Sequence, residues 1–422
     1  MGFLESYFRG LFSIFLSDQF AASVSLLYAL FPFWGPPLLA FGFYMVWIQW
    51  VRSKFIHSWD YVLLEIKLPR EVYKSPLAME LALSGLFVTS GEATPFDVYV
   101  LGKTRPWFSL EIASIDGNIH FYIWTRTGYR NVVESQLYGQ YPDIEIFEVE
   151  DYTKAVPYFD PEKVFFGGHE YKLDKPDPYP IKTYVDYGLD KDPKEEFKID
   201  PLTSVLEYMG SINKGEQIWL QIIIQGHKKK HKKGTWFGET NIQEEAKDIV
   251  RELLNKLQEK SPSVLAGEEG ETVSFKRFPT KGESEVIAAI QRADGKLNFD
   301  CGVRIIYAAK PEVFQGVRIP QSINLMRPFA SKELNEFAYN WGTYFDYPWQ
   351  DYKRIRADFR RRRILKAYRL RSWFHPPFKR KNFILSSEEL ATIYHFPGKV
   401  LQAPSVNRVM SKKAEAPINL PR

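Results

Sequence analysis

The sequence predicts an α+β protein that begins with a transmembrane helix and continues into two ferredoxin-like units of the βαββαβ type. The second unit is expected to hold a helical insertion, and a helical, basic C-terminal region is expected to follow it. Three observations support this prediction. No charged side chain occurs between Asp18 and Arg52, the dipeptide DG at 116–117 separates two alternating segments, and the patterns beyond residue 60 follow the order β-α-β-β-α-β.

The first 58 residues are expected to form a membrane anchor. Roughly 20 apolar residues span the hydrocarbon core of a bilayer, and the segment near 33–52 has that length and composition. Because Pro32, Pro36 and Pro37 should interrupt a longer helix, the segment near 8–31 is expected to be a second span or an interfacial helix. A buried hairpin of core helices is the alternative, but 33 consecutive residues without charge are more than such a hairpin needs. The residues expected at the membrane interface are Trp47, Trp50, Arg52 and Lys54.

The charges around this anchor predict its orientation. Basic residues follow the span at once, and an excess of Lys and Arg marks the cytoplasmic side of a membrane helix. We therefore expect the protein in the inner, cytoplasmic membrane, with most of the chain in the cytoplasm. The single cysteine, Cys301, excludes an internal disulfide framework and agrees with a reducing compartment.

The first ferredoxin-like unit is expected over residues 59–155. Apolar and polar residues alternate on both sides of the DG dipeptide, which is a strong short-range signal of a β-hairpin. Ser75 followed by Pro76 is typical of a helix start, since serine caps free N–H groups and proline has none to cap. The expected strands are 61–69, 107–115, 118–126 and 144–150, and the expected helices are 75–88 and 128–140.

A second unit of related shape is expected over residues 156–315, although the two units share no sequence period. An inserted helix and a polar loop rich in Gly and Glu interrupt it. The expected strands are 179–187, 216–227 and 299–309, the expected helices are 200–212 and 283–293, and the inserted helix is 242–260.

Residues 316–398 are expected to be a helical, basic region. Residues 399–422 are expected to form an extended tail, because proline punctuates them. Ser386 and Glu389 have the spacing of a capping box at the start of the last helix. The expected helices of this region are 330–340, 351–374 and 385–398.

No pattern in the sequence favours catalysis. The segment GKT at 102–104 lacks the glycine that a phosphate-binding loop needs five residues earlier, because Asp97 stands there. His227 and His231 are four residues apart, but the five lysines around them oppose a dication. A solvated basic turn or a phosphate-contacting loop is therefore favoured over a metal site. We expect no enzyme activity, no cofactor and no metal.

Several sequence blocks between residue 60 and the end of the chain resemble a known family. They are LPREVYKSPLAMELAL, PWFSLEIASIDGNIHFYIWT, SQLYGQYPDIEIFEVEDY, GEQIWLQIIIQ, AYRLRSWF and NFILSSEELATIYHFPG. These blocks resemble the region before the motor core in membrane-attached ATPases of type IV secretion and conjugative DNA transfer, common in ultra-small bacteria of the candidate phyla. Fused members of that family continue into a P-loop ATPase, whereas this sequence stops at Arg422. The resemblance implies a membrane-anchored accessory domain and carries over no catalytic residue.

The most strongly charged segment is 353–381, with thirteen Lys or Arg and one acid, Asp358. Three interpretations compete: a solvated or self-paired helix face, binding to anionic lipid, and binding to nucleic acid or an acidic partner. Arginine pairs with phosphate in a fixed fork, and Tyr368, Trp373 and Phe374 interleave with the basic residues as stacking surfaces do. The candidate nucleic-acid or phosphate contacts are Arg360, Arg361, Arg362, Arg363, Lys366, Arg369 and Arg371, together with Lys228, Lys229 and Lys230.

The sequence favours a non-catalytic, membrane-anchored accessory component of a type IV secretion-like machine that docks a separately encoded P-loop ATPase. The alternative is a membrane-tethered nucleic-acid-binding protein that acts through segment 353–381. The partners considered are the lipid bilayer, the ATPase, DNA and a second copy of the chain. The docking element is expected in the helix at 385–398, with Glu388, Glu389, Tyr394 and Phe396 as its contact residues.

Overall fold

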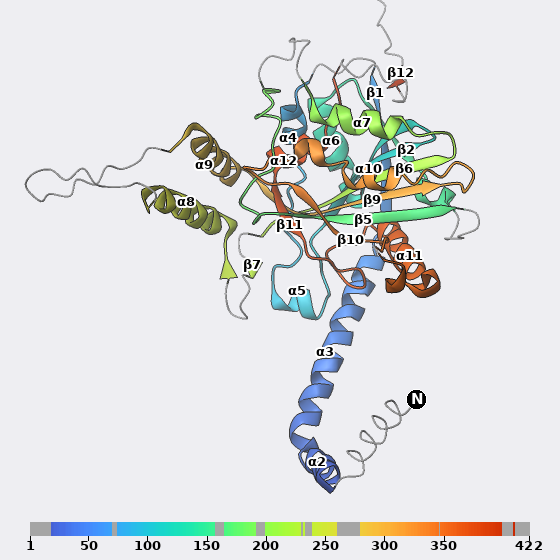
Figure 1. Cartoon of the computed structure of the whole chain (residues 1–422), viewed down its shortest axis with the longest axis vertical. Coiled ribbons are helices and arrows are strands. Elements are labelled where there is room, and N and C mark those ends of the chain that lie inside the picture. The colour runs from blue at the N-terminus through green and yellow to red at the C-terminus, as the bar shows by residue number, and fades with distance from the viewer. Residues whose placement is uncertain are drawn as a thin grey trace, which may run out of the picture. The chain divides into compact units, whose positions relative to one another are not determined.

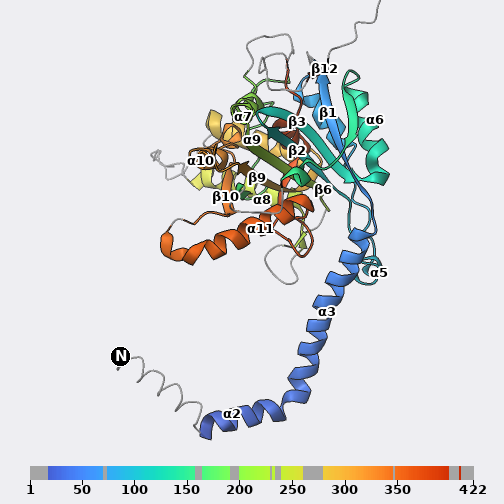
Figure 2. The same cartoon turned by 90° about the vertical axis from the view of Figure 1, so that its right-hand side faces the viewer.

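The computed structural model of the chain divides into two compact units (Figures 1 and 2). One unit consists of Met1–Ser58 and Ala93–Thr104, and the other of Trp59–Glu92 and Arg105–Arg422. The predictions for residues 8–17, for Lys229 and Lys230, and for most of the tail lie outside the described residues. The structure describes residues 18–69, 74–156, 164–190, 199–228, 231–232, 239–259, 279–345, 347–398 and 408–409.

The first unit contains a long apolar helix. Over the described residues, α3 (Phe31–His57) is the one helix long and apolar enough to span a membrane. At 1.5 Å per residue its 27 residues extend about 40 Å, more than the roughly 30 Å of a hydrocarbon core. The predicted interruption occurs just before the prolines: α2 ends at Ala29 and α3 begins at Phe31 with Pro32 in its first turn, whereas Pro36 and Pro37 lie inside α3. Each proline removes one backbone hydrogen bond near the start of the helix without ending it. The other helices of this unit are α2 (Asp18–Ala29) and α5 (Pro95–Tyr99).

The short helix α5, which was not expected from the sequence, packs beside α3. The indole nitrogen of Trp47 donates to the carbonyl oxygen of Tyr99 at 2.8 Å. Thr94 and Asp97 form a capping box at the start of α5, and Lys103 pairs with Asp97 at 2.8 Å. The GKT segment thus follows the short helix α5 and does not open a helix, as a phosphate-binding loop would.

An open sheet, in which the spatial order of the strands differs from their order in the chain, forms the centre of the second unit. Its strands follow the spatial order β10-β5-β9-β6-β2-β3-β1-β12, with β4 also paired to β1 and β11 to β9. All of these pairings are antiparallel except that of β12 with β1. The strands are β1 (Tyr61–Pro69), β2 (Trp107–Ile115), β3 (Asn118–Arg126), β4 (Glu145–Val149), β5 (Phe165–Leu173), β6 (Glu216–Gly226), β9 (Asn298–Ala309), β10 (Phe337–Gly342), β11 (Phe383–Ser386) and β12 (Arg408–Val409), with β7 (His231–Lys232) and β8 (Glu239–Thr240) in a separate pair.

Helices cover both faces of this sheet (Figure 1). The side chains of Phe108, Leu110 and Ile112 point into an apolar core under α4, α6, α7 and α12, whereas Ser109 and Glu111 point to the face that α11 covers. Burial of both faces explains why the central strands read as long apolar runs. The helices are α4 (Pro76–Ser84), α6 (Arg130–Gln140), α7 (Pro201–Gly210), α8 (Ile242–Glu259), α9 (Lys281–Asp294), α10 (Arg318–Ile323), α11 (Ile355–Arg369) and α12 (Ser387–Ile393).

The hairpin predicted around the DG dipeptide is confirmed, and its two strands have the predicted ranges, 107–115 and 118–126. Strands β2 and β3 end and begin at the two sides of the DG dipeptide, and their register pairs Ile115 with Asn118. Both turn residues have positive φ, 54° for Asp116 and 86° for Gly117. That geometry is the type I′ turn, whose twist matches that of the strands.

The strand predicted at 179–187 is wrong. Those residues form turns, because their backbone N–H groups bond to side chains and to carbonyl groups outside any strand, and not to a neighbouring strand. The N–H of Ile181 donates to Glu389 at 2.9 Å, and the N–H of Tyr184 donates to Thr392 at 3.0 Å. The strand of this part of the sheet is β5, where two adjacent glycines weakened the sequence signal. A Cβ on Gly167 would come within 2.1 Å of the Tyr344 hydroxyl, so a larger residue there would displace the Tyr344 side chain.

The helix predicted at 330–340 is also wrong. Residues 337–342 form the edge strand β10, and the alternation of Phe337, Tyr339 and Trp341 is the strand pattern that indicates it. Asn335 fixes the chain just before this strand. Its side chain donates to the Tyr179 carbonyl at 2.9 Å and accepts from the Lys175 N–H at 2.9 Å.

A buried ion cluster attaches the end of α11 to the sheet. Arg371, only 1% exposed, donates from Nε to Glu111 at 2.9 Å and also pairs with Asp151. Glu111 accepts further hydrogen bonds from Gln221 at 2.9 Å and from the Tyr152 hydroxyl at 2.9 Å. Burial disfavours the charged guanidinium, but the two carboxylates outweigh it and raise the pKa of Arg371 well above its ordinary value.

We expect Arg371→Met to destabilise the fold by about 3–5 kcal/mol, because it leaves two acidic groups without their buried cation. Urea denaturation of the full chain in mild detergent, followed by tryptophan fluorescence, measures the change. The matched control is Arg362→Met, an exposed position on α11, for which we expect a change within about 0.5 kcal/mol. Equal stability of the two variants would contradict a stabilising role of the cluster.

Candidate functional site: an arginine–aromatic cleft

A cleft of about 640 Å³ opens between strand β10 and helix α11. β10 forms it because an extra residue, Asn340, interrupts the pairing with β5, so that Tyr339 pairs with Tyr171 and Trp341 with Glu170. A bulge of this kind re-aims side chains at the edge of a sheet. The aromatic and arginine residues that line the cleft are Tyr339, Trp341, Tyr344, Phe345, Arg356 and Arg360.

The arginines of the cleft have aromatic and backbone partners. The guanidinium of Arg360 lies 4.1 Å from the centroid of the Phe345 ring and donates to the Gly342 carbonyl at 3.1 Å. Arg356 donates from its guanidinium to the Gln350 carbonyl at 3.1 Å. Over the part of the chain that the structure describes, neither is in an ion pair with a carboxylate. Both therefore keep donors for an anionic ligand.

The start of α11, which positions these arginines, is held by a carboxylate. The side chain of Asp351 accepts from the N–H groups of Arg356 at 2.7 Å and of Ala357 at 2.8 Å. Free N–H groups at a helix start need such acceptors. Asp351 thus fixes the end of the helix that forms one wall of the cleft.

Some of the basic residues predicted to contact nucleic acid or phosphate are exposed, and others are buried. Arg362 and Lys366 are exposed, and Arg363 is half-buried. Arg361 bonds to Asp358 at 3.3 Å, and Arg369 donates to the Thr153 carbonyl at 2.8 Å. Arg371 lies in the ion cluster, so its guanidinium is not available to a ligand at the surface. Of the seven predicted residues on this segment, Arg360 is the one that lines the cleft.

The lysine loop after β6 contributes one described residue. Lys228 is half-buried and pairs with Glu92 at 3.1 Å. Burial opposes ionisation of Glu92, but Arg105 and Lys228 outweigh it and lower the pKa of that carboxyl. Lys228 is therefore part of an internal ion pair, and it is not in the cleft.

The four predicted docking residues are buried, so the docking element expected at 385–398 does not present them at the surface. Glu388 accepts from the Thr183 hydroxyl at 2.6 Å and pairs with Arg292 at 2.9 Å. The hydroxyl of Tyr394 donates to the Tyr122 carbonyl at 3.2 Å. The segment forms β11 and α12 inside the core, with Glu388, Glu389, Tyr394 and Phe396 all at most 3% exposed.

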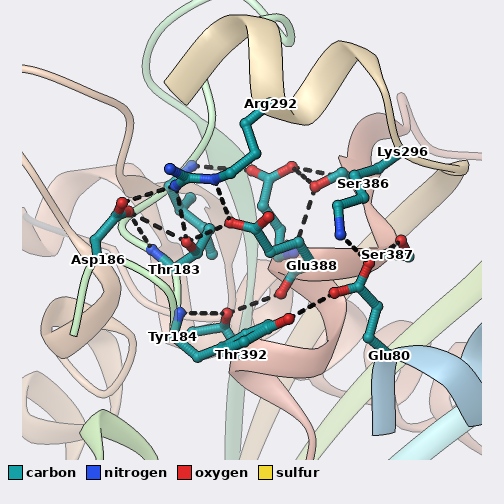
Figure 3. Close-up of polar contacts among 12 residues, drawn as sticks. Glu80, Thr183, Tyr184, Asp186, Arg292, Lys296, Ser386, Ser387, Glu388 and Thr392 are labelled. Atoms are coloured by element: carbon teal, nitrogen blue, oxygen red, sulfur yellow. Dashed lines mark hydrogen bonds and ion pairs between the residues drawn. The ribbon is translucent and has the colours of Figure 1, made fainter. Parts of the chain in front are cut away.

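A second buried carboxylate joins α4 to the same network. Glu80 accepts from Lys296 at 2.8 Å, from the Tyr184 hydroxyl at 2.7 Å and from the Ser387 hydroxyl at 3.0 Å. Figure 3 shows these side chains converging from separate elements on α12. The region is a stabilising polar core, since the donors and acceptors largely satisfy one another.

The predicted interface residues lie in α3. Trp50 and Lys54 are exposed, and the Lys54 ammonium lies 5.4 Å from the Trp50 ring centroid. The indole of Trp47 is hydrogen-bonded to the Tyr99 carbonyl within the same unit, and Arg52 is half-buried. No metal-binding group of three or more His, Cys, Asp or Glu side chains occurs over the residues that the structure describes.

Sequence reasoning missed most of the cleft because it assigned residues 330–340 to a helix and gave residues 341–350 no element. Residues 337–349 contain seven aromatic side chains in thirteen positions. That density, directly before a basic helix, was an available signal. The bulge at Asn340, which turns Trp341 toward the cleft, leaves no trace in the sequence.

The comparison with known families covers the whole cleft. The family described as "Domain of unknown function (DUF8128)" matches residues 93–409. The chain belongs to this family. Helix α3 precedes the matched region, whereas all the cleft residues lie inside it. No curated protein matches the chain.

We expect Glu389 to make the stability of the fold depend on pH. Burial raises its pKa to about 7, against hydrogen bonds from Ser386 and Ile181 that favour the ionised form. Between the ordinary value of 4.5 and about 7 the folded chain binds more protons at this site than the unfolded chain. Its contribution to stability is therefore complete below pH 4.5 and decreases as the pH rises through about 7.

The variant Glu389→Gln removes this titration and keeps a capping-box acceptor. The free energy of unfolding of the wild type minus that of the variant should decrease as the pH is raised from 4.5 to 7. Denaturant titrations of both proteins at several pH values measure the difference. A difference that stays constant over that range would mean that burial does not shift this carboxyl.

Proposed function

We propose that this protein is a non-catalytic, membrane-anchored binding protein that holds single-stranded nucleic acid in the cleft between β10 and α11. The observation that carries the proposal is the combination of four aromatic side chains and two arginines around one opening. Single strands are bound by aromatic rings that stack on bases and by cations that contact the backbone phosphates. A cleft of about 640 Å³ has the size of a ligand pocket and is too small for a duplex.

The anchoring part of the proposal rests on α3. We place this helix across the inner, cytoplasmic membrane, with the second unit in the cytoplasm. Support comes from its length and from Arg52 and Lys54 at its C-terminal end, since basic residues favour the cytoplasmic side.

We expect the cleft residues to affect nucleic-acid binding in two distinguishable ways. Trp341→Leu should weaken binding of a single-stranded oligonucleotide by about 1–3 kcal/mol with an unchanged salt dependence, because stacking involves no counterions. The double variant Arg356→Gln/Arg360→Gln should lower the slope of log K against log salt by about 0.7 for each phosphate that these arginines neutralise in the wild type. Fluorescence anisotropy with the full chain in detergent measures both.

The control for these variants removes two positive charges elsewhere. Arg251 on α8 and Arg327 after α10 are both exposed and do not line the cleft. Arg251→Gln/Arg327→Gln should leave the salt slope close to that of the wild type. An equal decrease in both double variants would mean that binding follows net charge and not the cleft.

A second function, docking of a separately encoded P-loop ATPase, is supported by a different surface. A groove of about 650 Å³ lies along helices α8 and α9, and Ile249, Leu253, Val286 and Ile287 supply its apolar lining. Such a groove suits the apolar face of a partner helix. The identity of the partner is inferred from the resemblance to type IV secretion and DNA-transfer proteins. We propose this groove as the docking surface instead of segment 385–398, which is buried.

We expect Leu253→Glu to abolish recovery of such an ATPase, because it places a charge in the apolar groove. Affinity capture of the full chain from native membranes, with identification of the co-purified proteins by mass spectrometry, measures recovery. Leu254→Glu is the matched control, since Leu254 is exposed on the same helix and does not line the groove. Equal recovery of an ATPase by both variants would contradict docking at this groove.

The strand order supports two ferredoxin-like units within the sheet. The first four strands lie in the order β4-β1-β3-β2, and the strands of the second half lie in the corresponding order β10-β5-β9-β6. Helix α4 follows β1 and α7 follows β5 at equivalent points, and α8 and α9 form the insertion between β6 and β9. On this proposal the second ferredoxin-like unit extends to Gly342. Pairing of β2 with β6 joins the two ferredoxin-like units into one sheet.

A further inference from the structure

A group of large apolar side chains is exposed around the start of α11, outside the cleft. Isolated exposed apolar residues are ordinary on soluble proteins, but a contiguous group marks an interaction surface. Five such residues occur within residues 347–359, and each is between 51% and 78% exposed. We call them the apolar ridge: Tyr347, Trp349, Tyr352, Ile355 and Phe359.

The helix presents this ridge together with positive charge. Ile355, Phe359, Arg362 and Lys366 are spaced by 4, 3 and 4 residues and are all exposed, so they follow one stripe of α11. The opposite stripe, which includes Ile364 and Tyr368, is buried against the sheet. The exposed stripe is apolar at the N-terminal end of the helix and basic further along it, and α11 is seen along its length in Figure 2.

The ridge is held in place by contacts of its own. The rings of Tyr347 and Trp349 stack with centroids 4.7 Å apart and an angle of 12°. Asp351 holds the N–H groups at the start of α11. Lys353 and Arg354, both exposed, lie between the aromatic residues and the helix. The surface is therefore arranged before any partner arrives.

We propose that the apolar ridge inserts into the interface of an anionic lipid leaflet, while Lys353, Arg354, Arg362 and Lys366 contact the lipid phosphates. Trp, Tyr, Ile and Phe beside Lys and Arg are the composition of helices that lie in a membrane interface. Ile355 has no planar ring to stack on a base, so hydrocarbon fits this surface better than nucleic acid. The basic side chains complement the negative charge of the lipids.

The connection of the chain to α3 favours this occupant, and the inference rests here on the proposed membrane anchor. α3 ends at His57 and β1 begins at Tyr61, so the second unit is linked to the anchor by three residues. A short linker gives a bilayer surface a high effective concentration near the ridge. A second attachment also matches the general need for two signals in stable peripheral binding.

A fluorescent label at the ridge tests the proposal in the full chain. Cys301 is the only cysteine, so Tyr352→Cys in a Cys301→Ala background carries one environment-sensitive label. The protein is reconstituted into phosphatidylcholine liposomes with and without phosphatidylglycerol, and nitroxide-bearing lipid serves as the quencher. We expect a blue shift and a loss of emission in the anionic liposomes. The additional changes Lys353→Gln, Arg354→Gln and Arg362→Gln should remove both effects.

The matched control places the same label at Ser204→Cys, an exposed position on α7 at the other face of the sheet. If the ridge label shows no more shift and quenching than this control in anionic liposomes, the proposal is wrong. A shift that appears only after addition of a single-stranded oligonucleotide would overturn it as well and assign the ridge to nucleic acid. Flotation with neutral liposomes reports on α3 separately, so failure of the anchor and failure of the ridge are distinguishable.

Discussion

The ion cluster of Arg371, Glu111 and Asp151 determines where the C-terminal region lies on the sheet. One guanidinium joins the chain just beyond α11 to the middle of β2 and to the residues after β4. Two carboxylates inside a protein are unstable without a cation, so this contact specifies one position for the segment. Trp107 reinforces it, since its indole donates to the carbonyl of Arg371 at 2.9 Å. The cleft depends on the same contact, because α11 forms one of its walls.

Local signals in the sequence were sufficient for the elements that they describe directly. The DG turn, the helix start at Ser75 and Pro76 and the capping box at Ser386 all occur as expected, although the side chain of Ser75 makes no capping hydrogen bond. The segment 179–187 failed for a physical reason, because its N–H groups bond to Glu389 and Thr392, about two hundred residues away in the chain. No local pattern distinguishes such a segment from a strand.

The candidate site was predictable in composition but not in geometry. Arg362 and Arg371 look equivalent in the sequence, yet the first is exposed and the second is buried with two carboxylates. The side of a helix that faces the sheet follows from tertiary packing, and four consecutive arginines cover every direction. The capping box was correct as local structure, but the sequence did not show that Glu389 is buried, where its carboxylate also accepts from the N–H of Ile181 at 2.9 Å.

The position of α12 has a consequence for biosynthesis. The hydroxyl of Ser387 bonds to Glu80 across 307 residues of chain, and α12 packs on α4 in the core. A growing chain on the ribosome has therefore made α4 long before the residues that cover it emerge. The core of the second unit closes only after α12 has been made, long after α3 has left the ribosome. Contacts of such long range make folding slow, and the incomplete body exposes apolar surface meanwhile. Early attachment to a membrane would then separate the unfinished chains from one another and limit their aggregation.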